Sequence, residues 1–357
     1  MAPTLASALT LSTLGHVSKA FLNLACKDVR VQGLEHLFRA LEEPDASASA
    51  DRTREVGKSD ARRSSAAKRS RRRGIITICN HTSVVDDPLM WGMMPLSTWF
   101  PFATPRYTSR HTRWTLGASD IMFKNPIMSK FFSLGQVIET VRGGGIFQPA
   151  IDDAIRKLGE GEWVNIFPEG KVNQPNLHPP GGMRRFKWGV SRMIMDAEEM
   201  PEVIPIWISG FDDVMPDTRK YLRFLPRPGK SVSITVGSPI TSKILPLVEE
   251  WRRIAQTRGS PGVGGKWSAS ARRNSFDEDE NALTTIRDAQ TRVQVASRNP
   301  ERQARALGLE GEERVRIEIC DLLYKELQGM GIEVEKAEGK DKRPWRTAVS
   351  IDGKVHT

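Results

Sequence analysis

Short apolar runs alternate along the chain with segments of helical pattern, and this alternation is the strongest constraint on the fold. The runs of strand length are residues 75–79, 137–141, 163–167, 203–208 and 232–236. The helical pattern occurs near residues 147–158 and 186–199. Strands that alternate with helices predict an α/β fold, with a mainly parallel sheet flanked by helices.

The formal net charge of the chain is +10, and most of it lies in one run. Residues 51–73 hold ten basic and three acidic side chains. A low-complexity run of Arg, Lys and Ser is typical of a solvated linker, and attraction to anionic lipid headgroups is the alternative. We expect no nucleic-acid partner, because the sequence has no finger spacing, aromatic RNA-binding signature or basic recognition helix.

Composition excludes several classes of protein. The cysteines, Cys26, Cys79 and Cys320, are too few for a disulfide scaffold or a cysteine-based zinc site. The histidines show no metal-ligand spacing, so we expect no metal. The sequence has no glycine-rich nucleotide fingerprint, and we expect no bound cofactor. No uninterrupted apolar run reaches the roughly 20 residues of a membrane-spanning helix, which excludes a polytopic membrane protein.

Two segments are candidates for contact with a membrane surface. Residues 1–27 contain no acidic residue. They carry a helix-like apolar stripe formed by Leu5, Leu9, Leu14, Val17, Phe21 and Leu24. A mitochondrial targeting segment, an amphipathic helix in the membrane surface and a helix packed on the core all remain open. Residues 88–105 are uncharged and broken by prolines, which fits either shallow insertion or an ordinary core helix with a loop.

These features divide the chain into a folded core and several additions. A membrane-associated N-terminal segment (1–43), a basic linker (44–73) and the core (74–256) come first. A partly disordered insertion (257–311), a helix packed on the core (312–330) and a polar tail (331–357) follow.

The segment NHTSVVDDP at residues 80–88 is the first candidate for chemistry. It follows the run 75–79, so His81 should lie on the loop that leaves a strand, and Pro88 marks a helix start. A loop of this length can fold back so that Asp86 accepts a hydrogen bond from one ring nitrogen of His81. The other nitrogen is then free to act as a general base. A structural histidine is the alternative.

The turn FPEGK at residues 167–171 is the second candidate. It follows the run 163–167, and a turn that contains Gly170 and Lys171 offers backbone N–H groups and a cation to a phosphate. An ordinary turn with a surface lysine is the alternative.

Arg142 is the third candidate, because it directly follows the run 137–141 and an arginine can bind a phosphate with two parallel hydrogen bonds. His81, Arg142 and the residues Glu169–Lys171 all follow the carboxyl ends of expected strands. That edge is where open α/β sheets bind their ligands.

These segments resemble the conserved blocks of the glycerolphosphate acyltransferase superfamily. The four blocks occur in the right order, as NHTSVVDDP at 80–88, VRG at 141–143, FPEG at 167–170 and VIPIW at 203–207. The longer strings FPEGKVN and RRFKWGVSRMI narrow the resemblance to the tafazzin family of phospholipid–lysophospholipid transacylases. The resemblance covers residues 74–252 strongly, and 5–43 and 312–328 weakly.

The resemblance implies a role for each candidate. His81 would remove a proton from the free hydroxyl of a lysophospholipid, and Asp86 would orient His81 and stabilise its imidazolium. Arg142, Lys171 and backbone N–H groups near Gly170 would hold a lipid phosphate. Glu169 would order that loop or bind a headgroup.

The resemblance also implies a lipid substrate and a location. It implies CoA-independent transfer between phospholipids and lysophospholipids, with cardiolipin remodelling at a mitochondrial membrane that faces the intermembrane space. An acyl-CoA-dependent lysophospholipid acyltransferase and a non-enzymatic lipid-binding scaffold are the alternatives. Cys79 offers an alternative nucleophile beside His81, although a cysteine at a strand end is more often buried and inert. The oligomeric state is left open.

Overall fold

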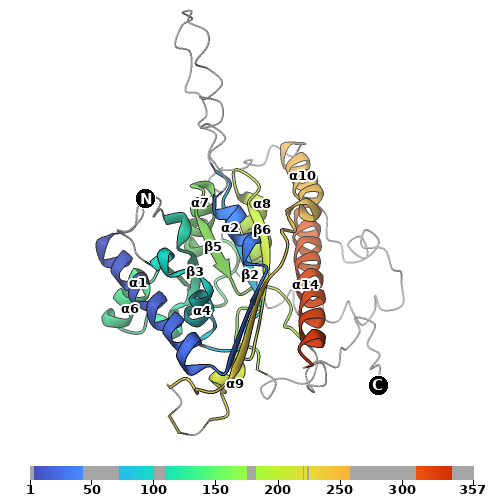
Figure 1. The fold of residues 1–357 in the computed structure, drawn as a ribbon. Helices are drawn as coiled ribbons and strands as arrows, with labels where there is room; N and C mark the ends of the chain where they lie inside the picture. Colours follow the sequence, from blue (N-terminus) through green and yellow to red (C-terminus); the bar gives the residue numbers. More distant parts are fainter. Residues whose placement is uncertain are drawn as a thin grey trace, which may run out of the picture.

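A seven-stranded sheet forms the centre of the structure (Figure 1). The computed structural model describes residues 4–42, 72–99, 109–174, 182–219, 221–222, 225–257 and 311–339. The strands are β1 (Asp28–Gln32), β2 (Ile75–Cys79), β3 (Trp114–Ala118), β4 (Val137–Thr140), β5 (Trp163–Ile166), β6 (Glu202–Ser209) and β7 (Ser231–Val236). Their order is β1-β7-β6-β2-β5-β3-β4, and only β6 and β7 pair antiparallel. The mainly parallel α/β fold that the sequence predicts is confirmed.

Helices cover both faces of the sheet. The longer ones are α1 (Leu5–Ala20), α2 (Leu34–Glu42), α6 (Pro126–Leu134), α7 (Pro149–Gly159), α8 (Gly189–Asp196), α10 (Thr241–Thr257) and α14 (Glu312–Ala337). Single helical turns are η1 (Phe21–Ala25), α4 (Asp86–Met90), η2 (Trp91–Met93), η3 (Leu96–Trp99), η4 (Ser109–His111), α5 (Ser119–Met122) and α9 (Phe211–Val214). One hydrophobic layer includes side chains of α7, α8, α10 and α14, and the other includes side chains of α2 and α4.

Strand β2 lies near the middle of the sheet and is buried along its whole length. Ile76 and Ile78 belong to the layer with α14, whereas Ile75 and Cys79 belong to the layer with α2. Because alternate side chains of a strand point to opposite faces, a strand covered on both sides reads as a continuous apolar run. The strand ends at Cys79, and the loop that carries His81 follows directly.

Two strands and part of one helix differ from the sequence-based expectation. β1 and β3 were not predicted. β1 is an edge strand with mostly exposed side chains, and β3 alternates buried with half-buried residues and contains Gly117. Neither therefore reads as a continuous apolar run. Helix α14 continues to Ala337, seven residues beyond the predicted boundary at residue 330.

Several predicted segments lie outside the described residues. These are residues 44–71 of the basic linker, residues 258–310 of the insertion and residues 340–357 of the tail. In the uncharged stretch, the described residues 88–99 favour the core interpretation, because Met90, Trp91 and Met94 are buried. None of the described helices combines the length and the apolar content needed to cross a bilayer.

Helix α1 packs on the core through a face made mostly of small residues. Ala8, Leu11 and Gly15 face inward, and a Cβ atom on Gly15 would lie within 2.1 Å of the Trp99 ring. Lys19 donates to the carbonyl oxygens of Gly92 (3.1 Å) and Met94 (2.8 Å). The helix therefore packs on the core, which is one of the interpretations left open by the sequence. Several residues of its predicted apolar stripe nevertheless face outward, among them Leu5, Leu9 and Val17.

Candidate active site

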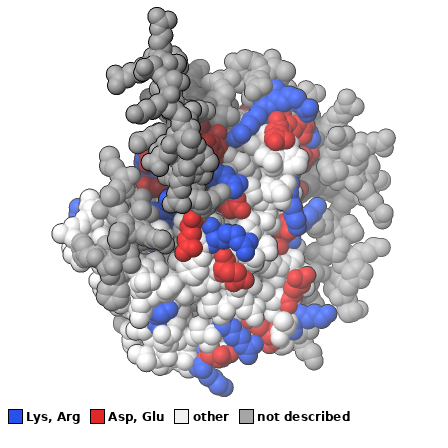
Figure 2. Space-filling model, turned by 45° about the horizontal axis from the view of Figure 1, so that its top comes forward, with Lys and Arg blue, Asp and Glu red and all other residues white. Residues whose placement is uncertain are grey.

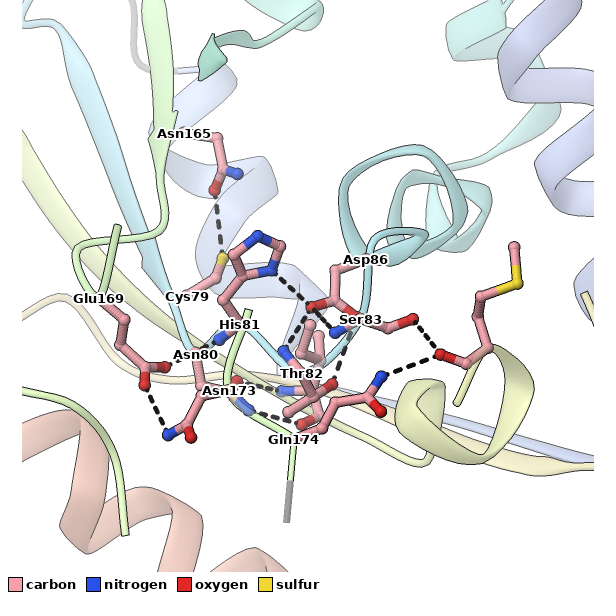
Figure 3. A network of polar contacts seen from close by, with 12 residues as sticks. Cys79, Asn80, His81, Thr82, Ser83, Asp86, Asn165, Glu169, Asn173 and Gln174 are labelled. Carbon is pink, nitrogen blue, oxygen red and sulfur yellow. Dashed lines mark hydrogen bonds and ion pairs between the residues drawn. The ribbon is translucent and has the colours of Figure 1, made fainter. Parts of the chain in front are cut away.

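The loops that follow β2 and β5 meet at the carboxyl edge of the sheet. β2 and β5 are neighbours and parallel, so the segments that leave them emerge side by side. The two loops are joined directly, because the backbone N–H of Asn173 donates to the carbonyl oxygen of His81 at 2.7 Å. Figure 3 shows this junction, with His81 between Glu169 on one side and Asp86 on the other.

His81 and Asp86 form a hydrogen-bonded pair, as the sequence predicts. Nδ1 of His81 lies 2.9 Å from Oδ2 of Asp86 (Figure 3). An ionised carboxylate only accepts hydrogen bonds, so Nδ1 carries the proton and Nε2 presents its lone pair. Within the described part of the chain, Nε2 has no hydrogen-bond partner, and the side chain is 20% exposed. The ring is thus held in the tautomer that a general base requires.

Asp86 is completely buried at the start of α4. Its Oδ2 also accepts the backbone N–H groups of Thr82 (2.6 Å) and Ser83 (2.8 Å). Burial raises the pKa of Asp86 above its ordinary value, and the hydrogen bonds from His81, Ser83 and Thr82 oppose that shift. These donors compensate the buried carboxylate and fix its orientation toward the imidazole.

Two contacts fix the His81 loop from its other sides. The Phe167 ring stacks on the imidazole at 4.3 Å between centroids, with an angle of 26° between the planes. Asn80 accepts the N–H of Ile208 (2.8 Å) and donates to its carbonyl oxygen (2.9 Å), which ties the end of β2 to β6. The imidazole therefore has little freedom to leave Asp86.

Glu169 joins the loops rather than facing open solvent. Its side chain is buried, Oε1 accepts the backbone N–H of His81 (3.0 Å), and Oε2 accepts from Asn173 Nδ2 (2.9 Å) and the backbone N–H of Arg184 (2.8 Å). Burial raises the pKa of Glu169, and the donors from Arg184, His81 and Asn173 oppose the shift. Of the two roles that the sequence left open, these contacts favour ordering the loop.

The phosphate-binding candidates lie on two separate strand ends. Lys171 and Gly170 are exposed after β5, and Gly170 has a φ of +69°, which suits glycine. Arg142 follows β4, and its Nε lies 3.4 Å from Oδ1 of Asp120. Since β3 lies between β4 and β5, the sheet brings Lys171 beside the His81 loop but sets Arg142 at a different strand end.

Comparison with known proteins identifies relatives of this chain. The sequence profile of the family described as Acyltransferase matches residues 60–209. Tafazzin of Saccharomyces cerevisiae is 32% identical over 286 residues, which are 69% of this chain and 65% of that protein. The chain belongs to the glycerolphosphate acyltransferase superfamily.

Two further relatives come from other eukaryotes. Tafazzin of Drosophila melanogaster is 38% identical over 166 residues, which cover 46% of this chain and 40% of the relative. The N-acylphosphatidylethanolamine synthase of Arabidopsis thaliana is 38% identical over 177 residues, which cover 49% and 58%. The chain thus spans between 40% and 65% of the lengths of these relatives.

Burial disfavours Cys79 as a nucleophile. Its thiol is fully buried and donates to Asn165 Oδ1 at 3.1 Å (Figure 3). Burial, with the nearby charges of Asp87 and Asp86, raises its pKa well above the ordinary value, so the reactive thiolate is disfavoured.

Sequence reasoning did not assign roles to Asn80, Phe167 or Asn173. All three lie within the strings NHTSVVDDP and FPEGKVN, so the motifs themselves marked them. Their main partners, however, lie on other segments and become visible only in the folded chain: Ile208 of β6 for Asn80, and His81 for both Phe167 and the backbone N–H of Asn173.

Proposed function

We propose that this protein transfers an acyl chain from a diacyl phospholipid to a lysophospholipid without CoA. The observation that carries the proposal is the His81–Asp86 pair, with Nδ1 bonded to a buried carboxylate and Nε2 unpaired within the described residues. A base oriented in this way accepts a proton from a hydroxyl group, which is the first requirement of ester formation.

The reaction then proceeds by exchange of one ester for another. His81 Nε2 takes the hydroxyl proton while the lysophospholipid oxygen attacks the ester carbonyl of the donor. As the tetrahedral intermediate collapses, the donor's glycerol oxygen leaves and takes the proton back from His81. Asp86 stabilises the imidazolium between the two steps. One ester bond forms and one breaks, so no high-energy thioester is consumed.

The remaining candidates bind the substrates in this proposal. Arg142, Lys171 and the backbone around Gly170 hold lipid phosphates, and Glu169 orders the loop between them and His81. In this proposal the substrates are cardiolipin and other phospholipids, and the protein is peripheral on a mitochondrial membrane that faces the intermembrane space. The similarity to tafazzins supports the mitochondrial association.

A liposome assay with purified protein tests the proposal. The liposomes contain a diacyl phospholipid labelled in its acyl chain and an unlabelled lysophospholipid, with CoA and acyl-CoA absent. We expect the label to move to the lysophospholipid, and added acyl-CoA to change the rate little. A strict requirement for acyl-CoA would replace the transacylase with an acyl-CoA-dependent enzyme.

The name of the Arabidopsis relative raises the question of whether the acceptor atom is an oxygen or a nitrogen. The same assay can answer it. Its name specifies N-acylation of phosphatidylethanolamine, whereas the proposal here specifies a hydroxyl acceptor. With lysophosphatidylethanolamine as acceptor, the product should be cleaved by mild base, because an ester is labile and an amide is not. A base-stable product would reassign the acceptor to the amine.

A membrane substrate also requires a surface that contacts the bilayer, and we assign this role to α1, α5 and α6. Leu5 and Leu9 of α1, Ile121 of α5, and Ile127 and Phe131 of α6 are exposed, and α1 contacts α6. Figure 2 shows this side of the molecule, at left, with few charged side chains. An apolar surface rimmed by polar groups inserts shallowly at the headgroup boundary.

Ile127→Asp is expected to weaken binding to neutral phosphatidylcholine vesicles by about tenfold or more, since burial of one such side chain contributes about 1.5–3 kcal/mol. Ile127 is 83% exposed, so the protein should fold normally. Cosedimentation measures the bound fraction. Ile332→Asp is the matched control, because Ile332 is 55% exposed on α14, away from this surface. Equal losses in both variants, or no loss in the first, would contradict the assignment.

A further inference from the structure

Two further cations, Arg184 and Lys187, lie beside Lys171. The sequence alone assigned no role to either of them. The backbone N–H of Lys187 donates to the carbonyl oxygen of Pro168 at 2.8 Å, and its Cγ would lie 3.3 Å from a Cβ atom on Gly170. Arg184 is held next to the same turn, because its backbone N–H donates to Glu169. Two segments distant in sequence thus bring Lys171, Arg184 and Lys187 to one strand end.

Donors of this group are unpaired within the part of the chain that the structure describes. Nε of Arg184 is buried and has no hydrogen-bond partner there. Lys171 and Lys187 are exposed and have no carboxylate partner there. Among the described residues, the backbone N–H groups of Lys171 and Val172 also have no acceptor. The carboxylate of Glu169 already accepts three hydrogen bonds, two from backbone N–H groups and one from Asn173. Unpaired cations and N–H groups around a turn with a left-handed glycine form an anion site.

This group is separate from Arg142. Because β3 lies between β4 and β5, the strand ends that carry Arg142 and Lys171 are about 10 Å apart. Arg142 is also exposed and pairs with Asp120 of α5. It follows β4, which lies on the other side of β3 from β5. The edge therefore offers two sets of phosphate donors rather than one.

Transfer between two phospholipids requires two phosphates near the same base. Two phosphates repel each other, and cations that already bind one phosphate cannot also neutralise the other. The second phosphate therefore needs a set of cations of its own. We propose that Lys171, Arg184 and Lys187, with the N–H groups of Lys171 and Val172, bind the phosphate of one lipid while Arg142 binds that of the other. The inference rests on the proposed function and specifies how its two substrates are held.

Binding stoichiometry tests the inference without reference to activity. Dihexanoylphosphatidylglycerol carries one phosphate and is used as a monomer in calorimetric titration of the full chain. We expect two sites in the wild type, one in Lys171→Ala/Lys187→Ala and one in Arg142→Ala. Lys336→Ala, an exposed lysine of α14, is the control and should retain both. A single site in the wild type overturns the inference, as does inorganic phosphate that binds as tightly as the lipid.

Kinetics assign each site to a lipid. In the liposome assay, Lys171→Ala/Lys187→Ala should raise the KM of one lipid by about tenfold or more, and Arg142→Ala should raise the KM of the other. An increase in the KM of the same lipid by both variants would place all the cations around one phosphate and overturn the inference, although transfer itself persists. Absence of transfer in the wild type would instead refute the proposed function, and the titration would still decide the number of sites.

Discussion

Replacement of His81 by alanine is expected to lower the rate of acyl transfer by at least about 10²-fold while the protein stays folded. The imidazole supplies the lone pair that accepts the hydroxyl proton. The loop itself does not depend on the ring, because the backbone N–H of His81 donates to Glu169 and its carbonyl oxygen accepts from Asn173. The substitution therefore removes the base and leaves its surroundings in place.

Initial rates in the liposome assay, with circular dichroism as a check on folding, measure this effect. His36→Ala is the matched control, because His36 lies in α2, which follows the edge strand β1, three strands away from β2. Its rate should equal that of the wild type. A folded His81→Ala variant with a normal rate would refute the catalytic role of the histidine.

Asp86→Asn should lose nearly as much activity, for a different reason. An asparagine can present its N–H₂ group to Nδ1 of His81, which then becomes an acceptor and places the proton on Nε2. The lone pair no longer points toward the substrate. Full activity in Asp86→Asn would show that the hydrogen bond of 2.9 Å is structural only.

The sequence located the His81–Asp86 contact because both partners lie in one short loop. Its length and the following Pro88 limit where Asp86 can lie, and the structure confirms the contact. The catalytic role remains a prediction. The position of the site at the carboxyl edge also followed from the sequence, since chain order alone places each motif after a strand.

Contacts between distant segments could not be predicted in this way. Glu169 accepts from Arg184, and Lys187 packs on Gly170, only because the segment after residue 182 folds back along the turn. The separation of Arg142 from Lys171 depends on strand order, which local pattern does not fix. With β3 unrecognised, nothing in the sequence placed a strand between their two ends.

Arg110→Met is expected to lower the free energy of unfolding by about 3 kcal/mol or more, since each hydrogen bond from a charged group contributes about 1.5–3 kcal/mol. The side chain is 3% exposed and donates to carbonyl oxygens of three separate segments. Two of them, Ala40 (2.7 Å) and Leu41 (3.2 Å), lie in the last turn of α2, where carbonyls have no partner within the helix.

The other two carbonyls belong to Arg73, which precedes β2 and accepts at 2.6 Å, and to Gly161, which precedes β5. Methionine fills a similar volume but donates nothing, so the loss measures the removal of this donor from four carbonyl oxygens. Arg156→Met is the matched control: Arg156 is exposed and pairs with Asp153 and Glu160, and surface pairs contribute at most about 1 kcal/mol. Urea unfolding of lipid-free protein gives both values. Equal midpoints for the two variants would show that water replaces the guanidinium, and that α2 is held by its apolar side chains rather than by Arg110.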